Sequence, residues 1–148
     1  MKSPAGILIR NDLMGSGYFG TPRGKRTHVG VDLAVLPGTP IHAPEKCTVE
    51  RLGVCYGNDP DFDLVLVSSM AFKHKILYVN PCVESGMRLE EGDLIGHSQN
   101  VQDRHGIKMI PHIHWEIFVA ALLDNDVPAH ENIISYVWIN PMNLLGLR

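Results

Sequence analysis

Short apolar segments separated by turn-forming residues recur along the whole chain. Most are four to eight residues long and rich in Val, Ile and Leu, a pattern that favours strands over helices. The expected strands are GILIR (6–10), VDLAVL (31–36), TPIHAP (39–44), CTVERLGV (47–54), FDLVLVSS (62–69), FKHKILYV (72–79), DLIGHS (93–98) and HIHWEIFVAAL (112–122). We therefore predict a mainly β fold: one domain over residues 1–148, built on an antiparallel, hairpin-rich sheet with few short helices.

Helical and turn signals are sparse. The best helical candidates are ENIISYVW (131–138) and NPMNLLGL (140–147), where Asn140 is suited to cap a helix and Pro141 to its first position. Between residues 83 and 98, Gly86, Gly92 and Gly96 have the spacing of tight turns between short strands.

The strand 112–119 has unusual chemistry. Alternate side chains of a strand point to opposite faces, so one face carries only Ile, Trp and Val, while the other carries His112, His114 and Glu116. That face either meets water or uses the nitrogen lone pairs. Far upstream, THVGVDLAV holds His28 and Asp32, whose plain interpretation is a turn histidine and an aspartate at the start of a strand. Together, however, a His, a carboxylate and one distant His make a three-ligand set whose open fourth position is typical of catalytic zinc.

Composition and charge exclude several classes of function. Net charge is −3, and no basic run is longer than the broken RGKR at 23–26, so we expect no nucleic-acid partner. The longest apolar runs fall far short of a membrane-spanning helix. The start, MKSPAGILIRND, has no apolar stretch of signal-peptide length. The three cysteines (Cys47, Cys55, Cys82) form no CxxC pair and are expected to be buried free thiols.

The motif pair H-x-x-x-D and H-x-H resembles the lysostaphin/LytM-type zinc endopeptidases, peptidase family M23. The text between the motifs agrees: GVDLAVLPGTPIHAPEKCTV and MRLEEGDLIGHS look like that family's segments before the H-x-H strand. The resemblance covers about residues 6–145. It implies that His28, Asp32 and His114 bind Zn²⁺, and that His112 is a general base for the zinc-activated water that attacks a peptide bond.

One position departs from the family pattern. A second active-site histidine is expected in ILYVNP, where Tyr78 matches the family's tyrosine but Asn80 stands in the histidine's place. An asparagine amide can donate a hydrogen bond to an oxyanion, but it cannot carry a proton at neutral pH. His105, in the loop before the H-x-H strand, is a candidate substitute, although an exposed loop histidine is the plainer interpretation. His74 is too far along its strand to reach the site.

Asn80 also suggests a subset of the family. FKHKILYVNP, GDLIGHSQ and RNDLMGSGYFGTPR resemble the subset that includes leukocyte-derived chemotaxin and phage and bacterial proteins. Two functions follow from these resemblances. The first is a zinc metalloendopeptidase that hydrolyses peptide bonds in peptidoglycan. The second is a zinc-binding module that recognises peptidoglycan or a partner protein with weak or no catalysis. A purely structural zinc would need a fourth protein ligand, and no Cys or His lies at suitable spacing.

The first hypothesis makes further expectations about the site and its delivery. GSGYFGTPR and the 99–111 loop would wall the substrate groove, and Arg10, Arg23 or Lys25 would meet a peptide carboxylate. If the natural chain begins at Met1, a wall hydrolase would reach its substrate through a phage particle, a specialised secretion system or lysis; the alternative is a leader that this sequence does not include. If it is a secreted effector, a cognate inhibitor is expected.

Overall fold

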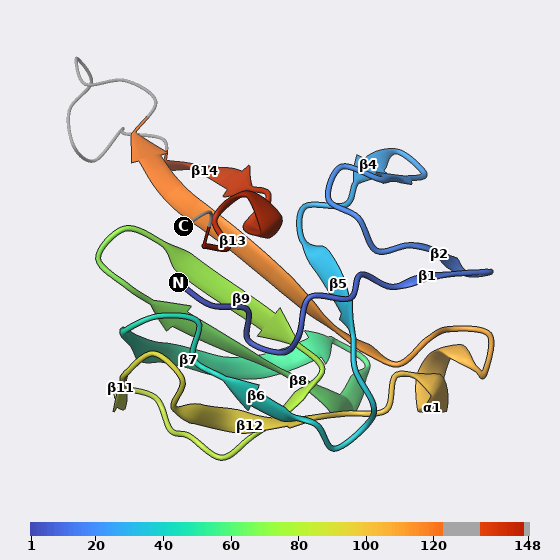
Figure 1. The fold of residues 1–148 in the computed structure, drawn as a ribbon, viewed down its shortest axis with the longest axis horizontal. Helices are drawn as coiled ribbons and strands as arrows, with labels where there is room; N and C mark the ends of the chain where they lie inside the picture. Colours follow the sequence, from blue (N-terminus) through green and yellow to red (C-terminus); the bar gives the residue numbers. More distant parts are fainter. Residues whose placement is uncertain (123–133, 147–148) are drawn as a thin grey trace.

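The computed structural model describes residues 1–122 and 134–146, and the long strand β13 (His112–Leu122) organises its largest sheet. In this seven-stranded antiparallel sheet the order is β11-β7-β8-β9-β13-β14, and β5 also pairs with β13 (Figure 1). The other strands of this sheet are β5 (Val31–Ala34), β7 (Cys47–Tyr56), β8 (Asp59–Ser68), β9 (Lys73–Leu77), β11 (Arg88–Leu89) and β14 (Ile134–Ile139). One edge of β13 pairs first with β5, over residues 112–115, and then with β14, over residues 117–122. Its other edge pairs with β9, so the first part of β13 lies between β5 and β9.

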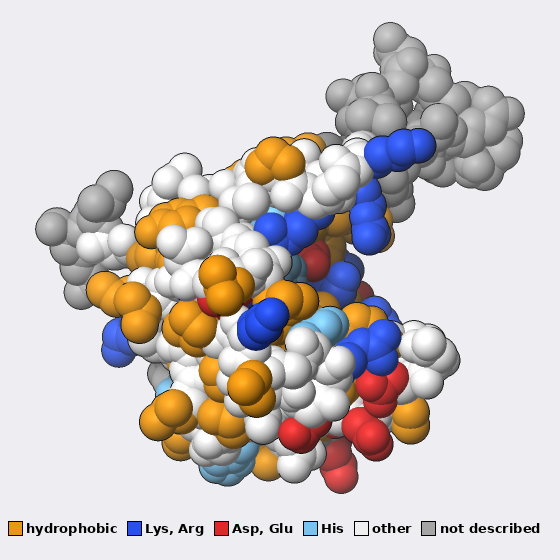
Figure 2. Space-filling model, turned by 90° about the vertical axis from the view of Figure 1, so that its right-hand side faces the viewer, with side chains coloured by type: hydrophobic (Ala, Val, Ile, Leu, Met, Phe, Trp, Pro, Cys, Tyr) orange, Lys and Arg blue, Asp and Glu red, His pale blue; other side chains and the backbone are white. Residues whose placement is uncertain are grey.

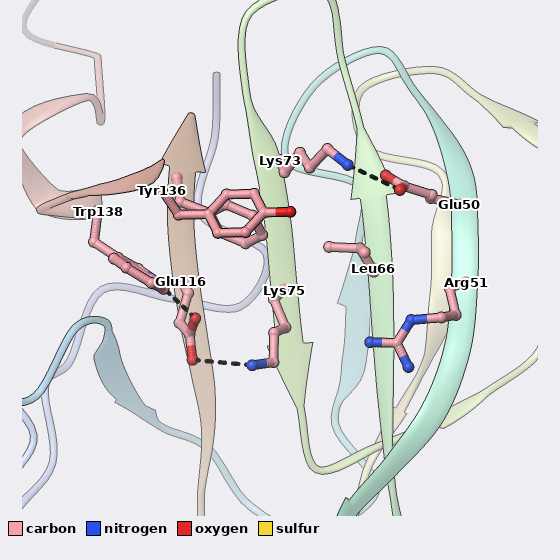
Figure 3. A pocket seen from close by; sticks show the side chains of 9 residues that line it. Glu50, Arg51, Leu66, Lys73, Lys75, Glu116, Tyr136 and Trp138 are labelled. Atoms are coloured by element: carbon pink, nitrogen blue, oxygen red, sulfur yellow. Dashed lines mark hydrogen bonds and ion pairs between the residues drawn. The ribbon is translucent and has the colours of Figure 1, made fainter. Parts of the chain in front are cut away.

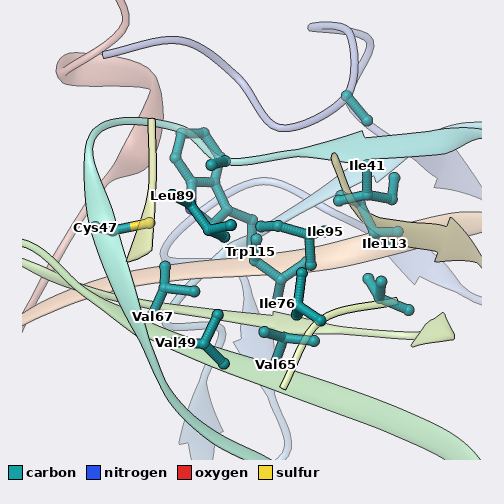
Figure 4. Packing of buried hydrophobic residues seen from close by; sticks show 14 of the residues in the cluster. Ile41, Cys47, Val49, Val65, Val67, Ile76, Leu89, Ile95, Ile113 and Trp115 are labelled. Atoms are coloured by element: carbon teal, nitrogen blue, oxygen red, sulfur yellow. The ribbon is translucent and has the colours of Figure 1, made fainter. Parts of the chain in front are cut away.

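A second, three-stranded sheet has the order β10-β12-β6, with β10 (Val79–Pro81), β12 (Leu94–Ser98) and β6 (Pro40–His42). Ile41 and Ile95 from this sheet join the main sheet's Ile76, Ile113 and Trp115 in one buried cluster (Figure 4). All five side chains are fully buried. The small sheet therefore covers one face of the main sheet, and the alternation of β13 sends its Ile and Trp side chains into this core.

The remaining elements are short. Two-stranded ladders pair β1 (Asn11–Asp12) with β2 (Gly15–Ser16), and β3 (Pro22–Arg23) with β4 (Arg26–Thr27). The helical pieces are α1 (Gln102–His105) and the 3₁₀ helix η1 (Pro141–Asn143). Among the described residues, no helix has the length and apolar character needed to cross a membrane.

The mainly antiparallel β fold is confirmed, but two element predictions are wrong. GILIR forms no strand: only Ile9 makes a single bridge, to Leu33, while Ile7 and Leu8 are exposed. ENIISYVW was expected to be helical, yet β14 begins at Ile134 and pairs along the edge of β13. Pairing with β13 therefore decides this segment, which is rich in β-branched and aromatic residues. Residues 131–133 lie outside the described part.

Local signals elsewhere were more reliable. The side chain of Asn140 accepts a hydrogen bond from the Met142 N–H at 3.1 Å, and Pro141 begins a helix as predicted, but this helix is a 3₁₀ turn over Pro141–Asn143 and does not extend through 147. Gly86 and Gly92 have positive φ, as tight turns require. Gly96 does not form a turn: it lies inside β12, where a Cβ would collide with the backbone carbonyl of Asn80.

The three cysteines are free thiols, as predicted, but only one of them is buried. Cys47 is buried, Cys55 is half-buried and Cys82 is exposed. Burial raises the pKa of both the Cys47 and Cys55 thiols to about 11, so neither is a reactive thiolate at neutral pH.

A histidine away from the H-x-H face has a purely structural setting. His74 is fully buried and stacks on Trp115, whose indole N–H donates a hydrogen bond to His74 Nδ1 at 3.2 Å. The proton therefore sits on Nε2, which donates to Glu45 Oε1 at 2.7 Å. As predicted, His74 does not reach the H-x-H face; instead it satisfies the buried indole.

We expect His74→Leu to destabilise the fold by about 1–3 kcal/mol, because the indole N–H of Trp115 loses its buried acceptor. Urea unfolding curves measure this change. The exposed His97 provides the control, and His97→Ala should change the unfolding free energy by less than about 0.5 kcal/mol. Equal stability of wild type and His74→Leu would contradict the assignment.

The same histidine should make stability depend on pH. Burial lowers the pKa of His74 below its ordinary value of 6.5, so the unfolded chain takes up this proton first as the pH falls. Its contribution is therefore present above pH 6.5 and lost as the pH falls below that value. Unfolding curves of wild type and His74→Leu should converge between about pH 7 and pH 5. A constant difference across this range would count against a neutral buried imidazole.

Candidate metal centre and cleft

The pairing of β5 with β13 brings the two predicted motifs together. In this register Asp32 lies directly opposite His114. His28 precedes β5 and approaches the same point, because the backbone at Gly30 passes very close to β13. A Cβ at Gly30 would lie 2.5 Å from the Trp115 carbonyl and 2.8 Å from the His114 ring. Only glycine allows this approach, so the local sequence HVGVD is part of the site.

Three potential ligand atoms form a small triangle. His28 Nε2 lies 3.1 Å from Asp32 Oδ1 and 3.0 Å from His114 Nδ1, and the third side, from His114 Nδ1 to Asp32 Oδ1, is 2.8 Å. The Asp32 and His28 side chains are buried, whereas His114 is slightly open to the cleft. Tetrahedral Zn²⁺ with bonds of about 2.0–2.1 Å needs sides of roughly 3.4 Å, so a small outward movement accommodates the ion.

The outer hydrogen bonds of both imidazoles aim lone pairs at the triangle. His28 Nδ1 donates to the Tyr18 carbonyl at 2.9 Å, and His114 Nε2 donates to Glu116 Oε1 at 3.1 Å. With those protons in place, His28 Nε2 and His114 Nδ1 carry the lone pairs that face Asp32. Such outer partners are a regular feature of metal-binding histidines. Two neutral nitrogens and a carboxylate oxygen are a set of ligand atoms that fits Zn²⁺.

The charges of the site support this assignment. Burial would raise the pKa of Asp32, but hydrogen bonds with His114 and His28 hold it well below its usual range. Burial would lower the pKa of His114, but its contacts with Asp32 and Glu116 raise it to about 9. Hydrogen bonding with His114 likewise outweighs burial at Glu116 and lowers its pKa to about 2. The pocket therefore favours positive charge at the point where the three ligand atoms meet.

The prediction that Arg10 meets a peptide carboxylate is wrong. Arg10 is buried, and its guanidinium donates to Asp32 Oδ2 at 2.8 Å and to Asp12 Oδ2 at 2.8 Å. Arg10 thereby occupies one oxygen of Asp32 and leaves Oδ1 for the triangle. Asp12 also accepts from the Ile110 backbone N–H at 2.7 Å, which fastens the 99–111 loop beside the site. This role of Arg10 was missed because a surface cation and a buried one look alike in sequence.

A cleft of about 260 Å³ opens beside the triangle. Its lining residues are Arg10, Arg23, His28, Asp32, Tyr56, Leu77, Tyr78, His105, Met109, His112 and His114. Figure 2 shows a hollow on this side of the molecule with basic, acidic and histidine side chains around it. Arg23 lines this cleft, where its guanidinium donates to the Ser16 carbonyl at 2.6 Å and lies 3.7 Å from Asp32 Oδ2, whereas Lys25 is exposed and is not part of the lining.

His112 has the geometry of a proton acceptor. Its Nδ1 donates to the Ile110 carbonyl at 2.7 Å, which leaves the lone pair on Nε2, 3.9 Å from Asp32 Oδ2. Burial lowers the pKa of His112, so the ring is neutral at pH 7. The imidazole lines the cleft and therefore presents a basic nitrogen next to the potential metal position.

Of the two other predicted catalytic residues, His105 lines the cleft and Asn80 does not. Asn80 is exposed, lies in β10 opposite His97, and is absent from the cleft lining. His105 is half-buried at the end of α1 and lines the cleft, where its Nε2 contacts the Tyr56 hydroxyl at 2.9 Å. The plain interpretation of His105 as an exposed loop residue is therefore wrong. Tyr56 was not predicted, because nothing in VCYGND marks it.

A second groove, of about 370 Å³, lies on the sheet face that carries His114 and Glu116 (Figure 3). Glu116 separates it from the triangle: Oε1 accepts from His114 and lies 3.6 Å from Lys75 Nζ, while Oε2 accepts from the Trp138 indole at 2.9 Å. Glu116 therefore acts as an outer hydrogen-bond partner of His114.

Comparison with known proteins identifies the family. The model of peptidase family M23 matches residues 26–126. The chain belongs to peptidase family M23. The chain is also 30% identical over 95 residues to an uncharacterized metalloprotease of Haemophilus influenzae, an overlap of 64% of this chain but 19% of that protein.

Solved structures of M23-type proteins share the fold. The antimicrobial peptidase lysostaphin from Staphylococcus simulans superposes with a TM-score of 0.58 and 20% identity, over 90% of this chain and 51% of that one. A mutant catalytic domain of the prophage-encoded M23 protein EnpA from Enterococcus faecalis gives 0.55 and 19%, over 78% and 85%. The lysostaphin-type architecture predicted from the motifs is thus confirmed. The closer likeness to the chemotaxin subset stays a prediction.

For this M23 chain we expect Glu116→Gln to weaken zinc binding about 10- to 100-fold, because loss of the carboxylate removes the charge that orients and polarises His114. Competition with a zinc-binding dye measures the affinity. Glu50→Gln is the matched control, since Glu50 lines the same groove but contacts Ser68 and Lys73 instead. An equal loss in both variants would contradict the role of Glu116.

Proposed function

We propose that this chain is a zinc-dependent endopeptidase that hydrolyses peptide bonds in bacterial peptidoglycan. The observation that carries the proposal is the convergence of His28 Nε2, Asp32 Oδ1 and His114 Nδ1 at one side of a cleft, with no fourth ligand in the group found among the described residues. Membership of family M23 supports a peptidase. Peptidoglycan as the substrate comes from the resemblance to the lysostaphin-type enzymes, one of which is described as an antimicrobial peptidase.

Zinc held by His28, Asp32 and His114 would supply a Lewis acid that polarises the scissile carbonyl and acidifies a water. His112 Nε2 accepts a proton from the attacking water as its oxygen bonds to the carbonyl carbon, and the C=O π pair moves onto the carbonyl oxygen. His112 then returns this proton to the leaving nitrogen as the C–N bond breaks. The Nδ1–H bond to Ile110 holds the ring in the tautomer that both transfers need.

Arg10 would keep Asp32 in its single-oxygen arrangement, and its second link through Asp12 fixes a wall of the cleft. Transport to the wall by a phage particle, a specialised secretion system or lysis, and a cognate inhibitor, stay predictions from the sequence.

The test is incubation of the zinc-loaded protein with purified peptidoglycan, followed by measurement of newly released amino groups. We expect release by wild type and at least about a 10²-fold loss in His112→Ala, because the general base is gone while the triangle is intact. Zinc content measured on the same samples should be one ion per chain in both. Asp32→Ala should lose both zinc and activity.

Two results would count against the proposal. Absence of products from wild type with one zinc bound would favour the binding module, and co-sedimentation with peptidoglycan would then identify it. Activity that survives in His112→Ala with bound zinc would remove His112 from the mechanism.

A further inference from the structure

Tyr78 has a backbone conformation that is unusual for its residue type. Its φ is 70°, and among the described residues it alone combines a positive φ with a side chain. Such a conformation persists only where the surroundings hold it, and it concentrates at functional sites. Here the Tyr78 N–H donates to the Asp63 carbonyl at 2.8 Å, and the Tyr78 carbonyl accepts from the Gln99 N–H at 2.9 Å. The backbone is thus fixed on both sides.

The consequence is a break in strand alternation. β9 ends at Leu77 in the main sheet and β10 begins at Val79 in the small sheet, so the predicted strand FKHKILYV is divided at Tyr78. Consecutive residues of a regular strand point to opposite faces. Leu77 and Tyr78 nevertheless both line the cleft, while Val79 is buried and Asn80 is exposed. The break therefore brings a tyrosine into the cleft and leaves the asparagine outside it.

The Tyr78 side chain reaches the neighbourhood of the proposed chemistry. Its ring meets the His112 ring edge-to-face, with centroids 5.5 Å apart. Its hydroxyl lies 2.7 Å from the Tyr56 hydroxyl, which lies 2.9 Å from His105 Nε2. Arg104 stacks its guanidinium 3.8 Å above the Tyr56 ring and pairs with Asp59, so this row of side chains is also held from outside.

The imidazole and the two hydroxyls allow a one-way order of donors. If His105 Nε2–H donates to the Tyr56 oxygen and Tyr56 donates to the Tyr78 oxygen, the Tyr78 proton is left for an acceptor in the cleft. Each bond polarises the next, which strengthens the last donor. Burial raises the pKa of Tyr78, so its hydroxyl keeps this proton at neutral pH. A peptide carbonyl gains negative charge on its oxygen during attack, and such an oxygen is the acceptor that preorganised donors stabilise most.

We propose that the Tyr78 hydroxyl donates a hydrogen bond to the oxyanion formed from the scissile carbonyl, and that Tyr56 and His105 are positioning residues that orient this hydroxyl. The inference rests on the proposed peptidase function. Tyr78 would then fill the part that the family resemblance gave to a second histidine, at the position of Asn80.

Tyr78→Phe tests the proposal while keeping the ring that packs against His112. We expect kcat on a soluble cross-link peptide to fall about 10²- to 10³-fold with KM little changed, because one oxyanion donor is lost. Affinity for a phosphinate analogue of that peptide, measured by calorimetry on the zinc-loaded protein, should fall by a similar factor, since the analogue imitates the tetrahedral oxyanion. Affinity for the uncleaved peptide, measured in the His112→Ala background, should stay within about two-fold of its value without the Tyr78 change.

Two further variants separate positioning from packing. Tyr56→Phe and His105→Gln should each lower phosphinate affinity by a smaller factor than Tyr78→Phe, and neither should add to the loss in a double variant with it. Asn80→Ala tests the competing donor: a kcat loss as large as that of Tyr78→Phe would return the oxyanion role to Asn80 and overturn the inference.

The outcomes distinguish this inference from the proposed function. Cleavage by wild type with unchanged kcat in Tyr78→Phe would overturn the role of Tyr78 and leave the peptidase assignment standing. If zinc-loaded wild type cleaves nothing, the peptidase assignment fails, and phosphinate binding still decides the role of Tyr78. Equal affinity in wild type and Tyr78→Phe, or no binding by either, would then overturn it.

Discussion

The site depends on one electrostatic constraint: three hydrogen-bond acceptors are held within about 3 Å of each other in a mostly buried corner. Strand pairing enforces this approach, because the register of β5 on β13 makes Asp32 and His114 neighbours, and Gly30 lets the chain carry His28 against them. Acceptors so close repel one another unless a cation or shared protons lie between them. The contacts with Asp32 and Glu116 that raise the pKa of His114 likewise favour a positive charge at this point.

A second ring of contacts makes this arrangement specific. Tyr18 and Glu116 fix the outer protons of the two imidazoles, and Arg10 neutralises the oxygen of Asp32 that faces away from them. The ring is built from distant parts of the chain, and its members also organise the walls: Arg10 binds Asp12, which holds the 99–111 loop, and Glu116 separates the cleft from the neighbouring groove. The site and its walls are therefore one hydrogen-bonded unit, and the core beneath them supplies the rigid support.

Tyr78 shows how one backbone angle decides which side chain of a motif lines the cleft. In a regular strand, residues 78 and 80 would share one face. The positive φ at Tyr78 divides the strand between two sheets, so the tyrosine lines the cleft and Asn80 faces solvent. Comparison of the motif ILYVNP with the family pattern draws attention to Asn80 alone. The backbone shows that Tyr78, and not Asn80, lines the cleft.

The sequence by itself determined the strand-rich fold, most strand positions, the cap at Asn140 and the family, because these follow from local periodicity, turn chemistry and short motifs that can be recognised without knowing their spatial arrangement. It also indicated that His112, His114 and Glu116 share a face, since alternation along one strand is a local property. Tertiary structure alone decided that residues 134–139 pair as a strand, that Arg10 is buried against Asp32, and that Tyr56, Tyr78 and His105 form a row in the cleft. Each of these depends on a partner at least 12 positions away or on one unusual backbone angle, and local pattern contains neither.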